Sequence, residues 1–386
     1  MTPPLLSPVT GAELVENGPD LLRDSDGQLW PVLDDIPYLR TGRDALVDEV
    51  VGHILVGDHT GALALLLADQ DDWWTGAKPD PADLETLIRE RDRLTLRAAM
   101  DLLGFDRVGT YFAHRWSDPT FLAGLGLLEA HWRPASSAFE LACGIGHYGR
   151  ELSRLGVHYT GVDVVFSKLW LAHHWVLPAD ARLLCFDAAE SWPLKKARFD
   201  LVFCHDAFYF LEPKPAILDA LRQMAGPDGR LALSHIHNSQ ADNLSAGRAI
   251  SIDGMAQLFP DALFYDDAEL TRALAEARAP QSARLADLDR VEAFAVEDRP
   301  RGPAHKLERG LAVPPAGAQL RLNPLYRPRQ DGLAIDWPSD RYRAEYGSRA
   351  TYPESLPDST VQQLEQAGQE VEAARRRILV DLPERW

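Results

Sequence analysis

A sharp glycine turn between two apolar runs constrains this chain more than any other stretch. Residues 138–164 read AFELACGIGHYGRELSRLGVHYTGVDV: an apolar run, a break at Gly144 and Gly146, a helix-compatible stretch, and a second apolar run ending on Asp163. Glycines suit such a turn because the backbone bends sharply and approaches a bound group with no Cβ in the way. An acid at the end of the second strand can accept hydrogen bonds from ribose hydroxyls. The order strand, turn, helix, strand predicts a site for a nucleoside-containing cofactor.

Two cofactor classes fit this turn. Gly144, Gly146 and Gly149 satisfy the pattern G-x-G-x-x-G, and an acid follows about twenty positions later, as in nicotinamide dinucleotide sites. The run ELACGIG, which starts at Glu140, places another acid inside the strand ahead of the glycines. That run resembles the first motif of class I methyltransferases that use S-adenosyl-L-methionine (SAM). The resemblance implies a methyl-donor site, and the dinucleotide interpretation stays open beside it.

Size and charge narrow the function further. The 386 residues exceed one average domain, and the net charge of −18 would repel a phosphate backbone, so we expect no nucleic-acid partner. The N-terminus lacks the pattern of a signal peptide and no apolar run is long enough to span a bilayer, so we expect no membrane partner. Cys143, Cys185 and Cys204 lie in or beside apolar runs, which predicts reduced thiols, a cytoplasmic location and no zinc knuckle.

The N-terminal segment, residues 1–42, resembles a different small domain. SPVTG from Ser7 and DGQLWPV from Asp26, with DIP further on, are similar to the zinc-ribbon-like domain that occurs as a methyltransferase activator or N-terminal appendage. The four ligand positions implied by that resemblance hold Ser7, Thr10, Arg23 and Asp26, and an arginine cannot ligate zinc. We therefore expect either a ribbon that has lost its metal or a Pro- and Gly-rich arm.

Residues 43–134 read as a helical cap. Leu46–Leu67 and Pro81–Leu103 have a largely helical apolar spacing, and proline is tolerated where a helix begins. Aromatic and basic side chains gather just ahead of the first core strand. In class I methyltransferases the helices at this place fold over the cofactor and close the substrate pocket. By that resemblance, the candidates for substrate contact are Tyr111, His114, Arg115 and Trp116.

The core continues as strands and helices in turn. We expect helices at Phe166–Trp175 and Pro215–Met224, and strands at Ala181–Phe186, Phe199–Cys204 and Arg230–Ile236. Such alternation predicts an α/β fold with a doubly wound, Rossmann-like parallel sheet, whose ligands lie beyond the carboxyl ends of the strands. The polar residues that collect at those ends are Asp163, Asp187, His205, Asp206, His235 and His237.

Later motifs extend the resemblance over residues 138–236. FDLVFCHD from Phe199 and FYFL from Phe208 resemble the family's fourth-strand motif, and PDGRL from Pro227 resembles its turn into the fifth strand. The family places an acid that accepts from the adenine amino group where this chain has Asp187. No Tyr-x-x-x-Lys pair occurs to favour a dehydrogenase. By this resemblance the cofactor-binding residues are Glu140, Ala142, Gly144, Gly146, Asp163, Val164, Asp187, Ala188 and His205.

The C-terminal third carries less signal. Residues 237–280 read as an insertion with helices, in the region where the family places substrate-specific elements, and Val291–Val296 reads as a closing strand. The Pro- and aromatic-rich tail is expected to form a hairpin or clamp over the core and to end in a helix at Ser359–Leu379. The expected divisions are 1–42, 43–134, 135–300 for the methyltransferase core and 301–386 for the extension.

The chemistry implied is methyl transfer to a small-molecule acceptor, on oxygen or nitrogen. Such an in-line displacement needs alignment, a desolvated pocket and a group that takes the acceptor's proton. Histidine suits the last role, so the catalytic candidates are His205, His235 and His237, while Tyr148 and Tyr209 are candidates to face the sulfonium. A divalent metal between His205, Asp206, His235 and His237 is the weaker interpretation, so no metal ligand is assigned.

Two other functions stay open on the sequence. One is a methyltransferase-like binding or scaffold protein that keeps the fold without turnover. The other, more distant, is an NAD-dependent oxidoreductase that uses the same glycine turn.

Overall fold

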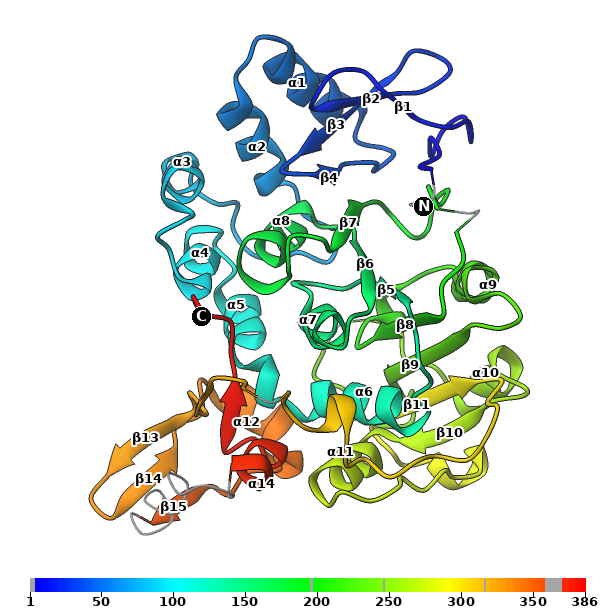
Figure 1. Cartoon of the computed structure of the whole chain (residues 1–386), viewed down its shortest axis with the longest axis vertical. Helices are drawn as coiled ribbons and strands as arrows, with labels where there is room; N and C mark the ends of the chain where they lie inside the picture. Colours follow the sequence, from blue (N-terminus) through cyan, green and yellow to red (C-terminus); the bar gives the residue numbers. More distant parts are fainter. Residues whose placement is uncertain (1–3, 195–196, 246, 316, 358–369) are drawn as a thin grey trace.

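A computed structural model describes residues 4–194, 197–245, 247–315, 317–357 and 370–386. Its centre is a seven-stranded sheet flanked by helices, with the N-terminal strands at one end of the molecule and the C-terminal extension at the other (Figure 1). In order across the sheet the strands are β10 (Leu263–Asp266), β11 (Ala293–Asp298), β9 (Arg230–His237), β8 (Leu201–His205), β5 (Ser137–Leu141), β6 (His158–Asp163) and β7 (Arg182–Cys185).

The sheet confirms the Rossmann-like α/β class but is mixed in direction. Strands β9, β8, β5, β6 and β7 pair in parallel, whereas β11 runs antiparallel to both β9 and β10. The strands that the alternation predicted to be parallel are parallel, and the direction of the closing strand was not predicted because an apolar run marks a strand without fixing its direction. Ala293, which begins β11, pairs with His237 at the end of β9. Strand order reverses between β5 and β8, and in sheets of this kind the ligand binds in a crevice beyond the carboxyl ends of the strands at such a reversal.

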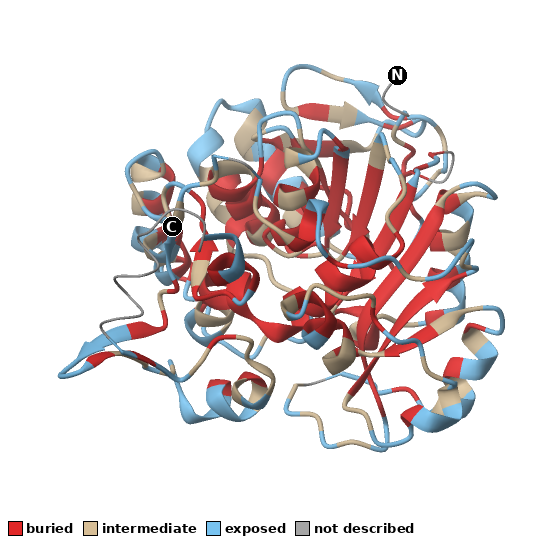
Figure 2. Cartoon of the chain, turned by 60° about the horizontal axis from the view of Figure 1, so that its bottom comes forward, coloured by how far each residue is buried: buried red, intermediate tan, exposed pale blue. Residues whose placement is uncertain are grey.

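Helices cover both faces of the sheet, whose strands are buried (Figure 2). Helix α6 (Pro119–Ala130) is buried along its whole length because it lies between β9 and α11 (Asp267–Ala275). Its sequence is accordingly apolar on almost every side. Asp118 begins the helix by accepting the Thr120 N–H at 2.7 Å. The other core helices are α5 (Asp106–His114), α7 (His147–Arg154), α8 (Phe166–Leu171) and α9 (Lys214–Ala225).

Each of the two long helical stretches predicted ahead of the core is divided. Gly57, at a φ of 81°, ends the first helix, and the Asp58 side chain begins the second by accepting a backbone N–H. Thr95 begins the fourth helix in the same way. Apolar spacing continues across both breaks, which is why the pattern did not mark them. The four helices are α1 (Asp44–Leu55), α2 (His59–Ala68), α3 (Pro81–Glu90) and α4 (Leu96–Leu102).

The N-terminal segment forms a small antiparallel sheet that joins the edge of the central one. Its strands are β1 (Val15–Glu16), β2 (Leu21–Arg23), β3 (Leu29–Leu33) and β4 (Ile36–Pro37). Directly after β4, Tyr38 pairs in parallel with Cys185 of β7, and the Leu39 N–H donates to the Cys185 carbonyl at 2.7 Å. The segment therefore continues the sheet beyond β7.

The region after β9 contains a strand where helices alone were expected. The chain passes through α10 (Ile252–Leu258), then β10, then α11. Strand β10 was missed because its short apolar run, Leu263 to Tyr265, lies between two stretches with helical spacing.

The C-terminal extension projects from the core as a hairpin and returns as a strand (Figure 1). Of the closing helix expected at Ser359–Leu379, residues 359–369 lie outside the described residues; in the remainder α14 is helical, and β16 begins where the helix was expected to end. No helix in the described ranges is both long and apolar enough to cross a bilayer. The elements are β12 (Leu320–Leu322), β13 (Tyr326–Arg329), β14 (Gly332–Ile335), α12 (Asp340–Tyr346), β15 (Ser355–Pro357), α14 (Glu370–Arg375) and β16 (Leu379–Asp381).

Candidate functional site

The glycine turn after β5 has a left-handed backbone, which gives the sharp bend that its sequence predicts. Gly144 and Gly146 have φ values of 56° and 80°, and Ala142 reaches 57° although it carries a Cβ. The Gly144 N–H donates to Asp163 Oδ2 at 3.0 Å, and the Val165 N–H donates to Asp163 Oδ1 at 3.0 Å. Asp163 therefore fixes the turn against the end of β6.

Each glycine of the turn meets a different neighbour. A Cβ on Gly146 would lie 2.8 Å from Leu177 Cδ1, and one on Gly144 would lie 3.2 Å from Phe112. A Cβ on Gly149 would lie 2.4 Å from the Tyr159 ring, so this third glycine allows α7 to pack closely on β6. The first two glycines shape the crevice, and the third serves the fold.

Glu140 lies inside the protein, beneath the turn. Its carboxyl accepts a hydrogen bond from the Tyr159 hydroxyl, and burial raises its pKa to about 8 although that hydrogen bond works in the opposite direction. The side chain is 2% exposed. Glu140 is therefore placed to support the turn from below.

Asp187, at the end of β7, is less buried than Glu140. Asp187 is half-buried, and its Oδ1 accepts the Ala189 N–H at 2.9 Å, while Ala188 is buried beside it. Arg40 follows the segment that pairs with β7, and its Nη1 donates to Gln70 O at 3.2 Å. The N-terminal segment therefore lies beside the end of β7.

Asp206, directly after β8, is the centre of a buried network. Its carboxylate accepts from the Tyr111 hydroxyl at 2.6 Å, from Arg115 Nη1 at 2.8 Å and from the Tyr209 hydroxyl at 2.9 Å. Burial would raise the pKa of Asp206, but the charges of His235 and Arg115 with these hydrogen bonds hold it at about 2. The predicted contact residues Tyr111, Arg115 and Tyr209 therefore converge on one carboxylate.

The three candidate histidines have different surroundings. His235 Nδ1 lies 2.8 Å from Asp267 Oδ2; burial lowers its pKa, but Asp206 and Asp267 outweigh this and raise it. The His237 ring stacks on Tyr209 with centroids 3.6 Å apart, and burial lowers its pKa to about 3. The ligand atoms of Asp206, His235 and His237 all lie within 4.8 Å of one another.

His205 lies apart from that group. Its Nδ1 is 2.8 Å from Ser234 Oγ, and its Nε2 is buried with no hydrogen-bond partner. Burial lowers its pKa to about 3. The ring faces Tyr148 at 4.7 Å, between the turn after β5 and the Asp206 network.

Three other predicted contact residues point elsewhere. His114 faces Tyr342 and Trp386, with centroids 6.1 and 6.0 Å away. Trp116 packs on His147 at 4.3 Å. The Tyr148 hydroxyl donates to the carbonyl of Phe121 at 3.3 Å and shares that bond with the carbonyl before it, so it is committed to α6.

Sequence reasoning missed Asp267 and the contribution of the extension. Asp267 begins α11, and no sequence signal links it to His235. From α12, Glu345 Oε1 accepts the Ser245 hydroxyl at 3.1 Å, and Arg349 Nη2 lies 3.1 Å from Glu292 Oε1. These contacts hold the extension against the loops that follow β9 and precede β11.

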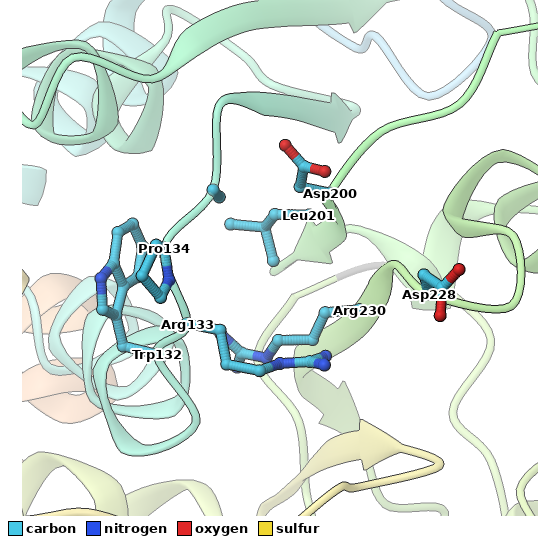
Figure 3. Close-up of a pocket in the computed structure, with 8 residues that line it drawn as sticks. Trp132, Arg133, Pro134, Asp200, Leu201, Asp228 and Arg230 are labelled. Atoms are coloured by element: carbon cyan, nitrogen blue, oxygen red, sulfur yellow. The ribbon is translucent and has the colours of Figure 1, made fainter.

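A hollow of about 150 Å³ lies at the opposite ends of the strands (Figure 3). It is bounded by Trp132, Arg133 and Asp228 and by Arg230 at the start of β9. Arg230 is occupied, because it pairs with Glu297 at 2.6 Å and donates to carbonyls of α6. The hollow is therefore separate from the crevice at the carboxyl ends.

The residues around the turn fit SAM. Several buried polar atoms near the ends of β6, β7 and β8 have no partner among the described residues, and such atoms call for a ligand or water. Ribose hydroxyls, an adenine amino group and an amino-acid end group supply suitable partners for them. The atoms are Arg40 Nε, Gln70 Nε2, Ser167 Oγ and His205 Nε2.

Comparison with known families identifies the domain. Residues 139–233 match the model of a methyltransferase domain. This range begins in β5 and ends in β9, so it contains the glycine turn, Asp163, Asp187 and Asp206. Residues 139–233 therefore form a methyltransferase domain with a Rossmann-like fold, and the cofactor of this domain is SAM. The choice between the two cofactor classes is decided in favour of the methyl donor.

Solved structures give further similarities. A chain in the complex between the Trm112 methyltransferase activator and a putative methyltransferase of Haloferax volcanii is 18% identical, over 54% of this chain and 99% of that one, with a TM-score of 0.39. A possible histamine N-methyltransferase of Thermotoga maritima is 11% identical over 53% and 99%, with a TM-score of 0.34.

A third similar structure is a protein of Pyrococcus horikoshii. It is 21% identical over 29% of this chain, with a TM-score of 0.26, and the match spans about half of that protein's length (51%). No curated protein matches the chain.

Proposed function

We propose that this methyltransferase acts on a small-molecule acceptor, which it methylates on oxygen or nitrogen. The observation that carries the proposal is the convergence on Asp206 of side chains from α5, from the turn after α5 and from the turn after β8. This network lies beyond the carboxyl ends of β8 and β9, on the side of the sheet where we propose that the glycine turn receives SAM. Its buried setting suits a small acceptor better than a broad macromolecular surface.

The role of each residue in this proposal follows from its contacts. SAM, when bound, supplies a methyl group on a positively charged sulfur. Arg115 and Tyr111 hold Asp206 in place, and Asp267 orients the His235 ring. The unpartnered Nε2 of His205 lies between the two halves of the site and is available to an acceptor or to SAM. In this proposal, the protein accelerates methyl transfer mainly by aligning the acceptor with the methyl group in a pocket that excludes water.

We also infer that the N-terminal segment is a zinc-ribbon-like fold without its metal. Ser7 Oγ donates to Asp24 Oδ2 at 3.1 Å, so a hydrogen bond joins the turn that starts at Ser7 to the turn that starts at Asp24. Ser7 Oγ accepts the N–H groups of Val9 and Thr10, and Asp24 Oδ1 accepts those of Asp26 and Gln28. Asp24, rather than the exposed Arg23, therefore faces Ser7.

Turnover with a panel of amines, phenols and carboxylic acids tests the acceptor, with methylated product read by mass spectrometry. Tyr111→Phe should raise the KM for the acceptor while leaving the dissociation constant of S-adenosylhomocysteine unchanged. Tyr326→Phe is the matched control, because its hydroxyl bonds to the Pro353 carbonyl in the extension. Activity confined to proteins or nucleic acids would overturn the proposal.

A further inference from the structure

We propose that Asp206, His235 and His237 bind a divalent transition-metal ion such as Mn²⁺, Fe²⁺ or Zn²⁺. One carboxylate and two imidazoles form a ligand set that these ions accept, with further positions left for water or substrate. The ligand atoms lie within 4.8 Å of one another. Among the described residues, these three form the group of His, Cys, Asp or Glu side chains whose spacing could hold a metal ion.

The His235 ring is held as a ligand needs to be held. Its Nδ1 lies 2.8 Å from Asp267 Oδ2, and Asp267 Oδ1 accepts the His235 backbone N–H at 3.1 Å. A carboxylate on one ring nitrogen fixes the tautomer and directs the lone pair of the other nitrogen. That other nitrogen, Nε2, lies 3.8 Å from Asp206 Oδ1, too far for a hydrogen bond and suited to an ion between them.

His237 supplies an independent observation. It is 3% exposed, and a ring nitrogen lies within 4.8 Å of the ligand atoms of both Asp206 and His235. The stacked Tyr209 ring, 3.6 Å away and tilted by 11°, holds it in one orientation beside His235.

Local charge and backbone geometry agree with this assignment. Asp206 and Asp267 bring two carboxylates, and Arg115 pairs with Oδ2 of Asp206 and leaves Oδ1 turned toward His235. Tyr209 donates to Oδ1 as well, but a carboxylate oxygen has two lone pairs. Asp206 and His235 both have left-handed backbones, with φ of 54° and 53°, a strain that gathers at functional sites.

Such an ion would lie where the acceptor is proposed to bind. Resting on that proposed function, its further role would be to orient an acceptor oxygen and lower the pKa of its hydroxyl. His205, included with these residues on sequence grounds, is not part of the group, because its Nδ1 is taken by Ser234.

The test measures ion binding alone, without SAM or acceptor. The full chain is stripped with a chelator and titrated with Mn²⁺, followed by electron paramagnetic resonance, and with Zn²⁺, followed by calorimetry. We expect one equivalent to bind. Asp267→Asn should weaken binding by about 10- to 100-fold, and His237→Gln, which removes a proposed ligand, should weaken it at least as much.

The control is His158→Gln, which removes an exposed imidazole at the start of β6 and should leave the affinity unchanged. Circular dichroism checks that each variant folds. The proposal is overturned if the wild type binds no stoichiometric ion, or if His237→Gln and Asp267→Asn bind like the wild type. SAM binding is measured separately, so loss of this proposal is distinguishable from loss of the proposed function.

Discussion

Arg115 and Asp206 form a buried ion pair, with Arg115 Nη1 2.8 Å from Asp206 Oδ2 and side chains only 5% and 8% exposed. The two residues are 91 positions apart, so the pair joins the segment before α6 to the end of β8. Because Tyr111 donates to the same carboxylate oxygen, the pair fixes the end of α5 against the sheet. The geometry of the candidate site therefore depends on a contact between distant parts of the chain.

Removing the cation should cost far more stability than removing a surface charge. Arg115→Met leaves the Asp206 carboxylate buried without its guanidinium, and we expect the free energy of unfolding to fall by about 3–5 kcal/mol. Urea denaturation measures this. Arg93→Ala, which removes an exposed arginine 3.4 Å from Glu90, should cost less than about 1 kcal/mol. Equal losses in the two variants would contradict the role given to the pair.

Gly146 should be needed for its shape as well as for its backbone conformation. Gly146→Ala places a Cβ 2.8 Å from Leu177 Cδ1 at a φ of 80°, whereas Gly156→Ala meets nothing within 4 Å at a φ of 78°. Both variants should lose about 1–2 kcal/mol to left-handed strain. Gly146→Ala should lose more and should also weaken binding of S-adenosylhomocysteine, as measured by calorimetry. Equal stability and affinity in the two variants would show that the turn has no close neighbour to displace.

The glycine turn shows what local sequence can predict. The turn, the strand ends and the acid at Asp163 lie within one continuous stretch, so their types and spacing were enough to place them. The predicted strands β7, β8 and β9 also lie within a few residues of their expected bounds. Each of these predictions rests on the spacing of apolar residues and on the residue types in turns, and both depend only on residues close together in the sequence.

Partners from distant elements could not be predicted in the same way. Asp267 reaches His235 only because the first residue of α11 lies next to β9, and nothing near either residue in the sequence signals the contact. Arg23 was assigned a ligand position, but the neighbouring Asp24 faces Ser7 because strand residues alternate between two faces. A one-residue error in register exchanges the inward and outward side chains.

Glu140 should make the protein less stable as the pH rises. Its pKa is about 4.5 as a reference value and about 8 in the folded chain. Between these values the folded state keeps a proton that the unfolded state has lost, so the free energy of unfolding falls by about 1.4 kcal/mol per pH unit from this group. Below the lower value the effect is absent.

Glu140→Gln should remove that dependence. Its amide oxygen still accepts from the Tyr159 hydroxyl, so we expect the variant to be more stable than the wild type at pH 8 and similar to it near pH 4.5. Urea denaturation across this range supplies the comparison. A parallel pH profile for the two proteins would show that Glu140 ionises freely in the folded state.

Calorimetric titration of the chain with SAM and with S-adenosylhomocysteine tests the central claim most directly. Each should bind with one equivalent, and NADH should not bind. Asp187→Asn should weaken both by about tenfold, since it removes a charged acceptor worth about 1.5 kcal/mol, while the exposed Asp180→Asn should not. Absence of binding by SAM and S-adenosylhomocysteine to the folded chain would contradict the account.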